Sequence, residues 1–149
     1  HSPRSGFTLL ELIVVVAIIG LLATFILVAL RTARQRAREV RIRADVDTIR
    51  KHAELVYDRD GRYQALGVSD CVNPASTEEV NVLVEDIRDL GGCLTITVRD
   101  ETTFQNYCAA ASLDGTNRRF CVDSTNNVLE AANVGCFETS EDTYCSETP

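Results

Sequence analysis

Residues 7–30 read FTLLELIVVVAIIGLLATFILVAL, a run of 24 residues in which Glu11 carries the only charge. A helix of this length spans about 36 Å, which exceeds the roughly 30 Å of a bilayer's hydrocarbon core. The run therefore predicts a helix that crosses a membrane. A carboxylate costs about 2.5 to 3.5 kcal/mol at the bilayer centre and less near its edge, so we expect Glu11 to have a partner.

The helix is expected to continue well beyond this run. No Gly or Pro lies between Gly20 and Gly61, which predicts one helix over residues 7–58 with Gly61 as a left-handed cap. An apolar stripe in alternating steps of four and three predicts a buried face where a small head is seated. The stripe consists of Ile42, Val46, Ile49, Ala53 and Val56. A smaller stripe of Leu30, Ala33, Ala37 and Val40 is expected to meet other chains.

The rest of the chain predicts a short helix followed by strands. Ser76 and Glu79 have capping-box spacing, and apolar residues follow at helical intervals until Gly91 and Gly92. The period then changes to two, which predicts a strand from Cys93 to about residue 99. Residues 104–113 and 118–122 predict two more strands joined by a hairpin turn at residues 114–117. The resulting antiparallel sheet is expected to lie across the helix stripe.

Six cysteines all follow the apolar run, which indicates disulfides in an oxidising compartment. Zinc sites require closely spaced cysteine pairs, and the intervals here are 22, 15, 13, 15 and 9 residues. We therefore predict no metal site. The six are Cys71, Cys93, Cys108, Cys121, Cys136 and Cys145.

Six cysteines allow fifteen connectivities, and we expect pairing in sequence order. The predicted hairpin brings Cys108 close to register with Cys121. Cys136 and Cys145 flank a short acidic loop and would close the C-terminal tail. Cys71 paired with Cys93 would tie a connector to the first strand. Each bridge is expected to contribute about 2 to 4 kcal/mol.

Charge divides the chain into a basic stem and an acidic head. Residues 31–59 carry nine basic and five acidic residues, a net of +4, whereas residues 60–149 carry five and sixteen, a net of −11. An acidic surface repels phosphate, so we expect no nucleic acid partner. The basic stem is interpreted as the polar face of a helix in a bundle.

The sequence contains no recognisable catalytic constellation. Its histidines, His1 and His52, have no Ser or Cys placed to form a nucleophile pair, and there is no phosphate loop or dinucleotide fingerprint. Asp58 and Asp60 suggest calcium, but the further acids of a calcium loop are missing. We predict neither an enzyme nor a bound cofactor.

The N-terminal pattern resembles a known family. The segment Gly6-Phe7-Thr8-Leu9-Leu10-Glu11-Leu12, an apolar run containing Gly20 and a long charged helix together resemble type IV pilins and pseudopilins. The resemblance implies an α+β type IV pilin fold, in which a long N-terminal helix packs against a small, disulfide-braced antiparallel sheet. It divides the chain into a leader remnant (residues 1–6), a membrane or filament-core helix (7–30), an amphipathic continuation (31–59) and a globular head (60–149).

The same resemblance implies processing between Gly6 and Phe7 by a prepilin peptidase. The new amine of Phe7, commonly methylated in the family, would pair with Glu11 of a neighbouring subunit and set the subunit register. If residues 1–6 are retained, the alternative partners of Glu11 are Arg4, the His1 amine and Thr8. A further alternative places Glu11 in the lipid headgroup region.

Gly20 is the expected point of helix flexibility. Many pilins have a proline eight residues after the helix glycine, and this chain has Val28 there. The strongest reason for the helix to break is therefore missing. Gly20 still weakens the helix by up to about 1 kcal/mol relative to alanine.

Two topology signals conflict. Six arginines follow the apolar run, and by the positive-inside rule they would lie in the cytoplasm, with Arg4 on the other side. An oxidised six-cysteine head requires the opposite orientation. We favour the cysteines, which predicts an inner-membrane precursor with its head outside the cytoplasm.

The expected function is that of a structural subunit, the major pilin of a type IV pilus that serves adhesion or twitching motility as an extracellular filament. The resemblance implies a helical homo-oligomer, with a prepilin peptidase, an assembly ATPase and a platform protein as partners. The alternatives are a pseudopilin of a type II secretion or competence apparatus, and a membrane-anchored adhesin that does not polymerise.

Overall fold

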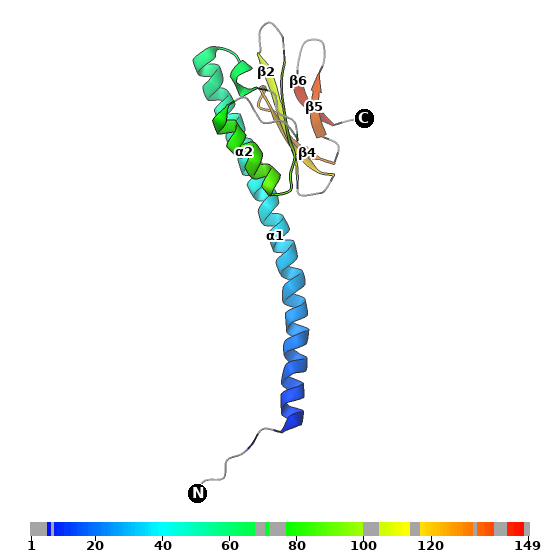
Figure 1. Ribbon diagram of the computed structural model, residues 1–149. Helices are drawn as coiled ribbons and strands as arrows, with labels where there is room; N and C mark the ends of the chain where they lie inside the picture. The colour runs from blue at the N-terminus through cyan, green and yellow to red at the C-terminus, as the bar shows by residue number, and fades with distance from the viewer. Residues whose placement is uncertain are drawn as a thin grey trace. The chain divides into compact units, whose positions relative to one another are not determined.

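The computed structural model describes residues 6, 8–67, 71, 77–99, 105–113, 117–132, 134–138 and 143–147. The chain forms two compact units, residues 1–36 and 37–149, which are described separately below. The long helix α1, Leu9–Asp60, contributes its first part to one unit and its second part to the other (Figure 1).

The continuous helix predicted for residues 7–58 is confirmed in type by α1, which begins at Leu9 and ends at Asp60. The helix ends at Gly61, whose φ of 68° is left-handed and whose N–H donates to the carbonyl of Tyr57 at 2.7 Å. Glycine adopts this conformation without a Cβ penalty. Gly61 is therefore the expected C-terminal cap.

The second unit contains two short helices and two sheets. The helices are η1, Gln64–Leu66, and α2, Glu78–Asp89. The larger sheet is antiparallel with strand order β1-β2-β3-β4, and β5 pairs with β6 in a separate antiparallel sheet. The strands are β1 Leu94–Arg99, β2 Asn106–Ser112, β3 Arg119–Asp123, β4 Val128–Ala131, β5 Val134–Glu138 and β6 Thr143–Glu147.

The sequence anticipated α2 and the first three strands but missed β4, β5 and β6, which are short and carry weak alternation. The α2 N-cap is Thr77, and it makes no side-chain cap hydrogen bond. The capping box predicted for Ser76 and Glu79 stays a prediction. Ser76 and the turn residues 114–116 lie outside the described residues.

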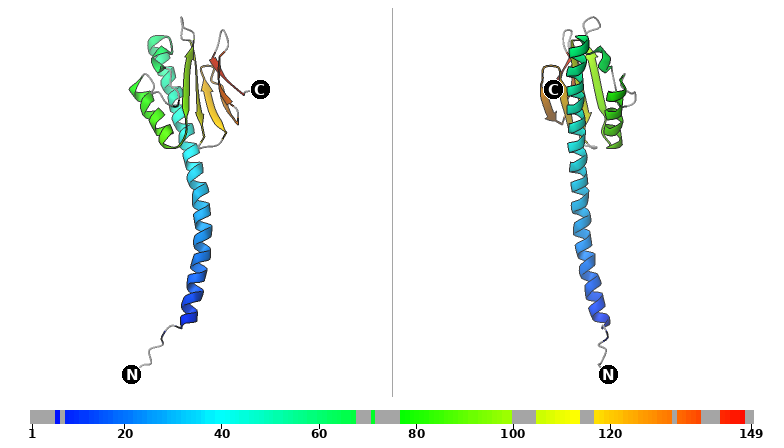
Figure 2. Two further views of the ribbon diagram at one scale, coloured as in Figure 1. Left: turned by 45° about the vertical axis from the view of Figure 1, so that its right-hand side comes forward. Right: turned by 90° about the vertical axis from the view of Figure 1, so that its left-hand side faces the viewer.

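The predicted helix stripe is the centre of the main core. All five of its residues are at most 2% exposed and pack with residues of α2 and of the larger sheet. The second part of α1 and α2 lie on one side of this sheet, while β5 and β6 lie on the other (Figure 2). The second unit is therefore built in three layers.

Strand β2 belongs to the larger sheet, which is the middle layer of the second unit, and it is buried on both faces. Tyr107, Ala109 and Ala111 join the core with the helices, whereas Cys108 and Ala110 join a second core with β5 and β6. Alternate residues of a strand point to opposite faces, so a strand between two layers must be apolar throughout. Its small side chains let both layers approach closely.

The turn between α2 and β1 requires a glycine for space. A Cβ at Gly92 would lie 2.9 Å from the Ser112 carbonyl oxygen and 2.9 Å from Cγ2 of Ile87. Because one of these atoms belongs to a paired strand, the neighbour cannot simply rotate away. Gly92 thus allows the first strand to start directly against the helix layer.

Candidate functional site

The N-terminus of α1 is capped by reciprocal hydrogen bonds between Thr8 and Glu11. The Thr8 N–H and hydroxyl both donate to Oε2 of Glu11, at 2.9 and 2.8 Å, and the Glu11 N–H donates to the Thr8 hydroxyl at 3.3 Å. This is a capping box, which satisfies backbone donors that a helix start leaves unpaired. Thr8 is one of the partners that the sequence proposed for this acid. The Thr-x-x-Glu spacing was a capping signal that the sequence interpretation did not use.

The second carboxylate oxygen of Glu11, Oε1, makes no hydrogen bond to any residue that the structure describes. One oxygen therefore holds the cap, and no described residue donates to the other. Phe7, the proposed donor after processing, lies outside the described residues, and Gly6 is exposed. The roles of Glu11, Phe7 and Gly6 in register and processing stay predictions.

The first part of α1 has an apolar surface on every side. Its large apolar side chains between Leu9 and Leu30 are 42–75% exposed within the chain. By length and composition this helix is apolar enough to cross a membrane. A surface of this size requires lipid or other apolar helices as its surroundings.

Gly20 lies within this apolar surface. The helix passes through it without interruption, and a Cβ at Gly20 would meet nothing within 4 Å. No contact inside the described part of the chain therefore explains a glycine here. Its proposed role in flexibility stays a prediction.

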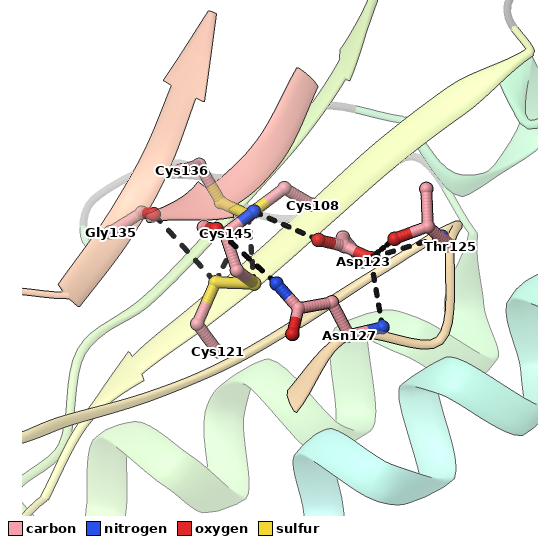
Figure 3. Close-up of a disulfide and its surroundings, with 8 residues drawn as sticks. All are labelled: Cys108, Cys121, Asp123, Thr125, Asn127, Gly135, Cys136 and Cys145. Carbon is pink, nitrogen blue, oxygen red and sulfur yellow. Dashed lines mark hydrogen bonds between the residues drawn. A yellow bond between two sulfur atoms is a disulfide. The ribbon is translucent and has the colours of Figure 1, made fainter. Parts of the chain in front are cut away.

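Two of the three predicted disulfides are wrong. The structure joins Cys71 to Cys93, the pair expected from the sequence, but it joins Cys108 to Cys136 and Cys121 to Cys145 (Figure 3). The pairs predicted as Cys108–Cys121 and Cys136–Cys145 do not form. The four cysteines instead make two bridges between the two sheets.

Strand register and facing directions explain this correction. Cys108 stands opposite Asp123, and Cys121 stands opposite Ala110, so the two cysteines are diagonal neighbours in one sheet. Side chains on one face of a sheet project side by side, whereas a disulfide needs Cβ atoms that converge to about 3.8 Å. Cys136 and Cys145 project from the facing sheet, and Cα–Cα distances of 5.6 and 5.9 Å across the gap meet the bridge requirement.

The two bridges are packed against each other in the second core. Sγ of Cys108 lies 3.2 Å from Sγ of Cys121 and 3.7 Å from Sγ of Cys145. Three sulfurs within 4.8 Å of one another have the composition of a soft-metal site. Metal ions bind thiolates, so these sulfurs are not ligands while the bridges are intact.

Asp123 is a buried acid that sequence reasoning missed. It is 1% exposed, and its Oδ1 accepts hydrogen bonds from the backbone N–H groups of Thr125 and Asn127 and from the Thr125 hydroxyl. Its Oδ2 accepts the N–H of Cys145 from β6 at 2.9 Å (Figure 3). One carboxylate therefore shapes the β3–β4 turn and ties it to the second sheet. The Asp-Ser-Thr-Asn-Asn run at 123–127 was the available turn signal.

A second group of acids lies where α1 and α2 meet. Arg41 donates two hydrogen bonds of 2.7 Å to the Asp86 carboxylate, and Asp45 is next to this pair. Burial, and then the neighbouring Asp86, raise the pKa of Asp45 to about 6. Asp45 Oδ2 is buried without a hydrogen-bond partner among the described residues. No pattern in the sequence indicates that these residues lie together.

A helix with an apolar first part, a small antiparallel sheet and cysteine bridges together define the α+β fold of pilins. The family model described as the prokaryotic N-terminal methylation motif matches residues 1–27, and this motif is the class III signal peptide of type IV pilins. The chain therefore carries a type IV pilin or pseudopilin N-terminus. The comparisons with curated proteins and with solved structures gave no match.

The motif carries three implications for this chain. It implies processing by a prepilin peptidase and assembly into pili, and together with the apolar helix it supports membrane anchoring. Proteins with the motif are structural subunits, not enzymes. The motif covers residues 1–27, so the head lies beyond the match.

Proposed function

We propose that the chain is the major pilin of a type IV pilus, a structural subunit that polymerises through its N-terminal helix into a surface filament for adhesion or motility. The observation that carries this proposal is the exposed apolar surface of α1 between Leu9 and Leu30, which directly follows the pilin motif. This surface suits acyl chains before assembly and neighbouring helices afterwards, because both are apolar.

Glu11 gives the helix bundle a means of setting register. Its Oε2 is engaged by Thr8, while Oε1 is open in the described part of the chain. An amine on Phe7 of a neighbouring copy would donate a charge-assisted bond to Oε1, with both charges relieved of part of their desolvation cost. A helix that slides by one turn would leave the carboxylate unpaired, so the pair selects one axial stagger.

The proposed domains follow from this mechanism. Residues 1–6 are the leader remnant, 7–30 the membrane and filament-core segment, 31–59 the continuation into the head and 60–149 the disulfide-braced head. The subunit starts as an inner-membrane precursor with its head outside the cytoplasm. The assembly ATPase and platform protein of a type IV pilus machine would extract it into the filament.

Electron microscopy of sheared cell-surface material tests the proposal. Long fibres that contain this chain as the main component support a major pilin. Short or absent surface fibres, with the chain required for secretion or DNA uptake, favour the pseudopilin alternative. Absence of any polymer, with the chain permanently in the membrane, favours an anchored adhesin.

Two variants of Glu11 separate register from anchoring. Glu11→Ala is expected to insert into the membrane at the wild-type level and to lower fibre yield at least about tenfold, because a charge-assisted bond is worth roughly 1.5 to 3 kcal/mol per subunit. Thr8→Val removes the hydroxyl contact to Oε2 and leaves Oε1 in place, so it separates the contribution of the helix cap from that of the intersubunit pair. Wild-type fibre yield from Glu11→Ala would remove the register argument.

A further inference from the structure

A pair of arginines follows the apolar surface directly. Arg31 and Arg34 are exposed, and they lie three residues apart on α1, which puts them on one face of the helix. Neither forms an ion pair with a residue that the structure describes. In a bundle of such helices, this face is a positive surface that no described residue of its own chain neutralises.

The groove between α1 and α2 carries the opposite charge. It is an open depression of about 380 Å³, lined by Arg41, Asp45, Val82, Leu83, Glu85, Asp86 and Asp89. Four carboxylates face one guanidinium, a net charge of −4 + 1 = −3, and that guanidinium is already bound to Asp86. The groove therefore has an excess of acceptors.

Two of these acids are placed to receive an arginine pair. Glu85 and Asp89 are exposed, lie four residues apart on one face of α2 and form no ion pair with the described residues. Their spacing of one helical turn matches that of Arg31 and Arg34. Exposed Val82 beside them offers an apolar surface for an arginine's methylene chain.

We propose that Arg31 and Arg34 of one copy dock in the α1–α2 groove of a second copy and pair with Glu85 and Asp89. The inference rests on the proposed polymerisation and names the head surface that the stem of a neighbour contacts. Guanidinium groups bind carboxylates through two parallel hydrogen bonds, so the match concerns geometry as well as charge.

Charge also argues against a lipid as the occupant of this arginine pair in the assembled state. Anionic headgroups would satisfy the arginines but leave the groove's net charge of −3 without a counterpart. A second copy satisfies both surfaces at once, and it does so once per subunit.

Zero-length carbodiimide cross-linking of sheared fibres tests the contact, because it joins an amine to a carboxylate with which it is paired. The native chain has a single lysine, Lys51, so Arg34→Lys introduces one new amine. We expect a cross-linked dimer in which the peptide containing position 34 is joined to the α2 peptide at Glu85 or Asp89. Arg62→Lys, at another exposed arginine, is the control and should give no such dimer.

Charge reversal supplies a second readout on the same fibres. Arg34→Glu is expected to lower fibre yield at least about tenfold, since like charges at a contact cost several kcal/mol. Glu85→Arg should do the same, and the double variant should recover most of the yield. Recovery requires that the two positions meet, so loss of folding in one variant cannot imitate it.

The outcomes separate this inference from the function on which it rests. If no fibres form from the native chain, the proposed function fails. If native fibres form but neither the dimer nor the recovery is observed, the docking contact is wrong and the pilin function stands. If Arg34→Glu leaves fibre yield unchanged and instead weakens binding to phosphatidylglycerol vesicles, the arginines serve the membrane and the proposal is overturned.

Discussion

Removing the Asp123 carboxylate is expected to weaken the contact between the two sheets, which the Cys108–Cys136 and Cys121–Cys145 bridges still join. Asp123→Ala deletes the acceptor for three backbone N–H groups, those of Thr125, Asn127 and Cys145. The substitution also creates a small void at a position that is 1% exposed. The cost depends on whether water can replace the lost acceptor at each donor.

The three donors differ in this respect. Cys145 is 3% exposed, so its N–H stays buried without a partner, which costs about 2 kcal/mol. Thr125 and Asn127 are exposed turn residues whose N–H groups can reach water, at about 0.5 to 1 kcal/mol each. The sum predicts that Asp123→Ala lowers the free energy of unfolding by about 3 to 4 kcal/mol.

Asp123→Asn provides a graded comparison. The amide keeps one oxygen for the turn donors but turns an NH₂ group toward the N–H of Cys145, so two donors face each other. We expect a loss of about 2 kcal/mol, the cost of that one buried donor. Ser124→Ala is the matched control, because its hydroxyl makes one long contact of 3.3 Å to Asn106 and should cost less than about 1 kcal/mol.

Urea unfolding of the full chain in a mild detergent, with disulfides oxidised, measures these differences. Near-ultraviolet circular dichroism follows the head, because Tyr63 contacts Tyr57 and Tyr107 in tilted ring pairs with centroids 4.9 and 4.8 Å apart. Amide hydrogen exchange reports on the Cys145 N–H directly, which should exchange faster in both Asp123 variants. An Asp123→Ala protein within about 0.5 kcal/mol of wild type, with a slowly exchanging Cys145 amide, would refute the reasoning.

Three other predictions follow from the head. Peptide mapping without reduction should recover Cys108 linked to Cys136. Recovery of Cys108 linked to Cys121 would instead support the pairing predicted from the sequence. Replacing both Cys108 and Cys136 with serine should lower the free energy of unfolding by about 2 to 4 kcal/mol. Because burial raises the pKa of Asp45 to about 6, its ionisation opposes folding as pH rises from about 4 through 6. Asp45→Asn should therefore raise the free energy of unfolding by about 1 kcal/mol at pH 7.5, a value discounted for the partial exposure of Asp45, and by little at pH 4. Equal increases at both pH values would contradict the raised pKa of Asp45. Gly92→Ala should cost about 1 to 3 kcal/mol in thermal unfolding, since its Cβ would overlap a strand carbonyl, and an unchanged melting temperature would show that the turn can shift.

Local patterns in the sequence were sufficient to predict the long helix and its buried stripe. The spacing of Ile42, Val46 and Ile49 specifies one helix face whatever packs on it, and the uninterrupted stretch before Gly61 specifies where the helix ends. These features depend on residues within one or two turns of each other. The pilin motif could be recognised in the sequence because it also lies within one continuous segment.

The disulfide pattern depended on tertiary structure. Counting from the hairpin turn placed Cys108 near Cys121, and they are indeed neighbours, but the bond direction is set by a second sheet whose strands carry weak sequence signals. The cysteines of the short strands β5 and β6 form their bridges with cysteines of the larger sheet, which faces them. Intervals along the chain contain no information about which faces oppose each other.

The acids Asp123 and Asp45 show the same division. Both look like ordinary surface acids in the sequence, and each acquires its role from a partner far along the chain, Cys145 in one case and Asp86 in the other. The sequence by itself determined a pilin-type helix, its membrane-compatible surface and the seat of its head, because these follow from spacing within a single helix. The tertiary structure decided the three-layer head, the bridges between its sheets and the acidic groove, because burial and pairing there arise only when distant segments meet.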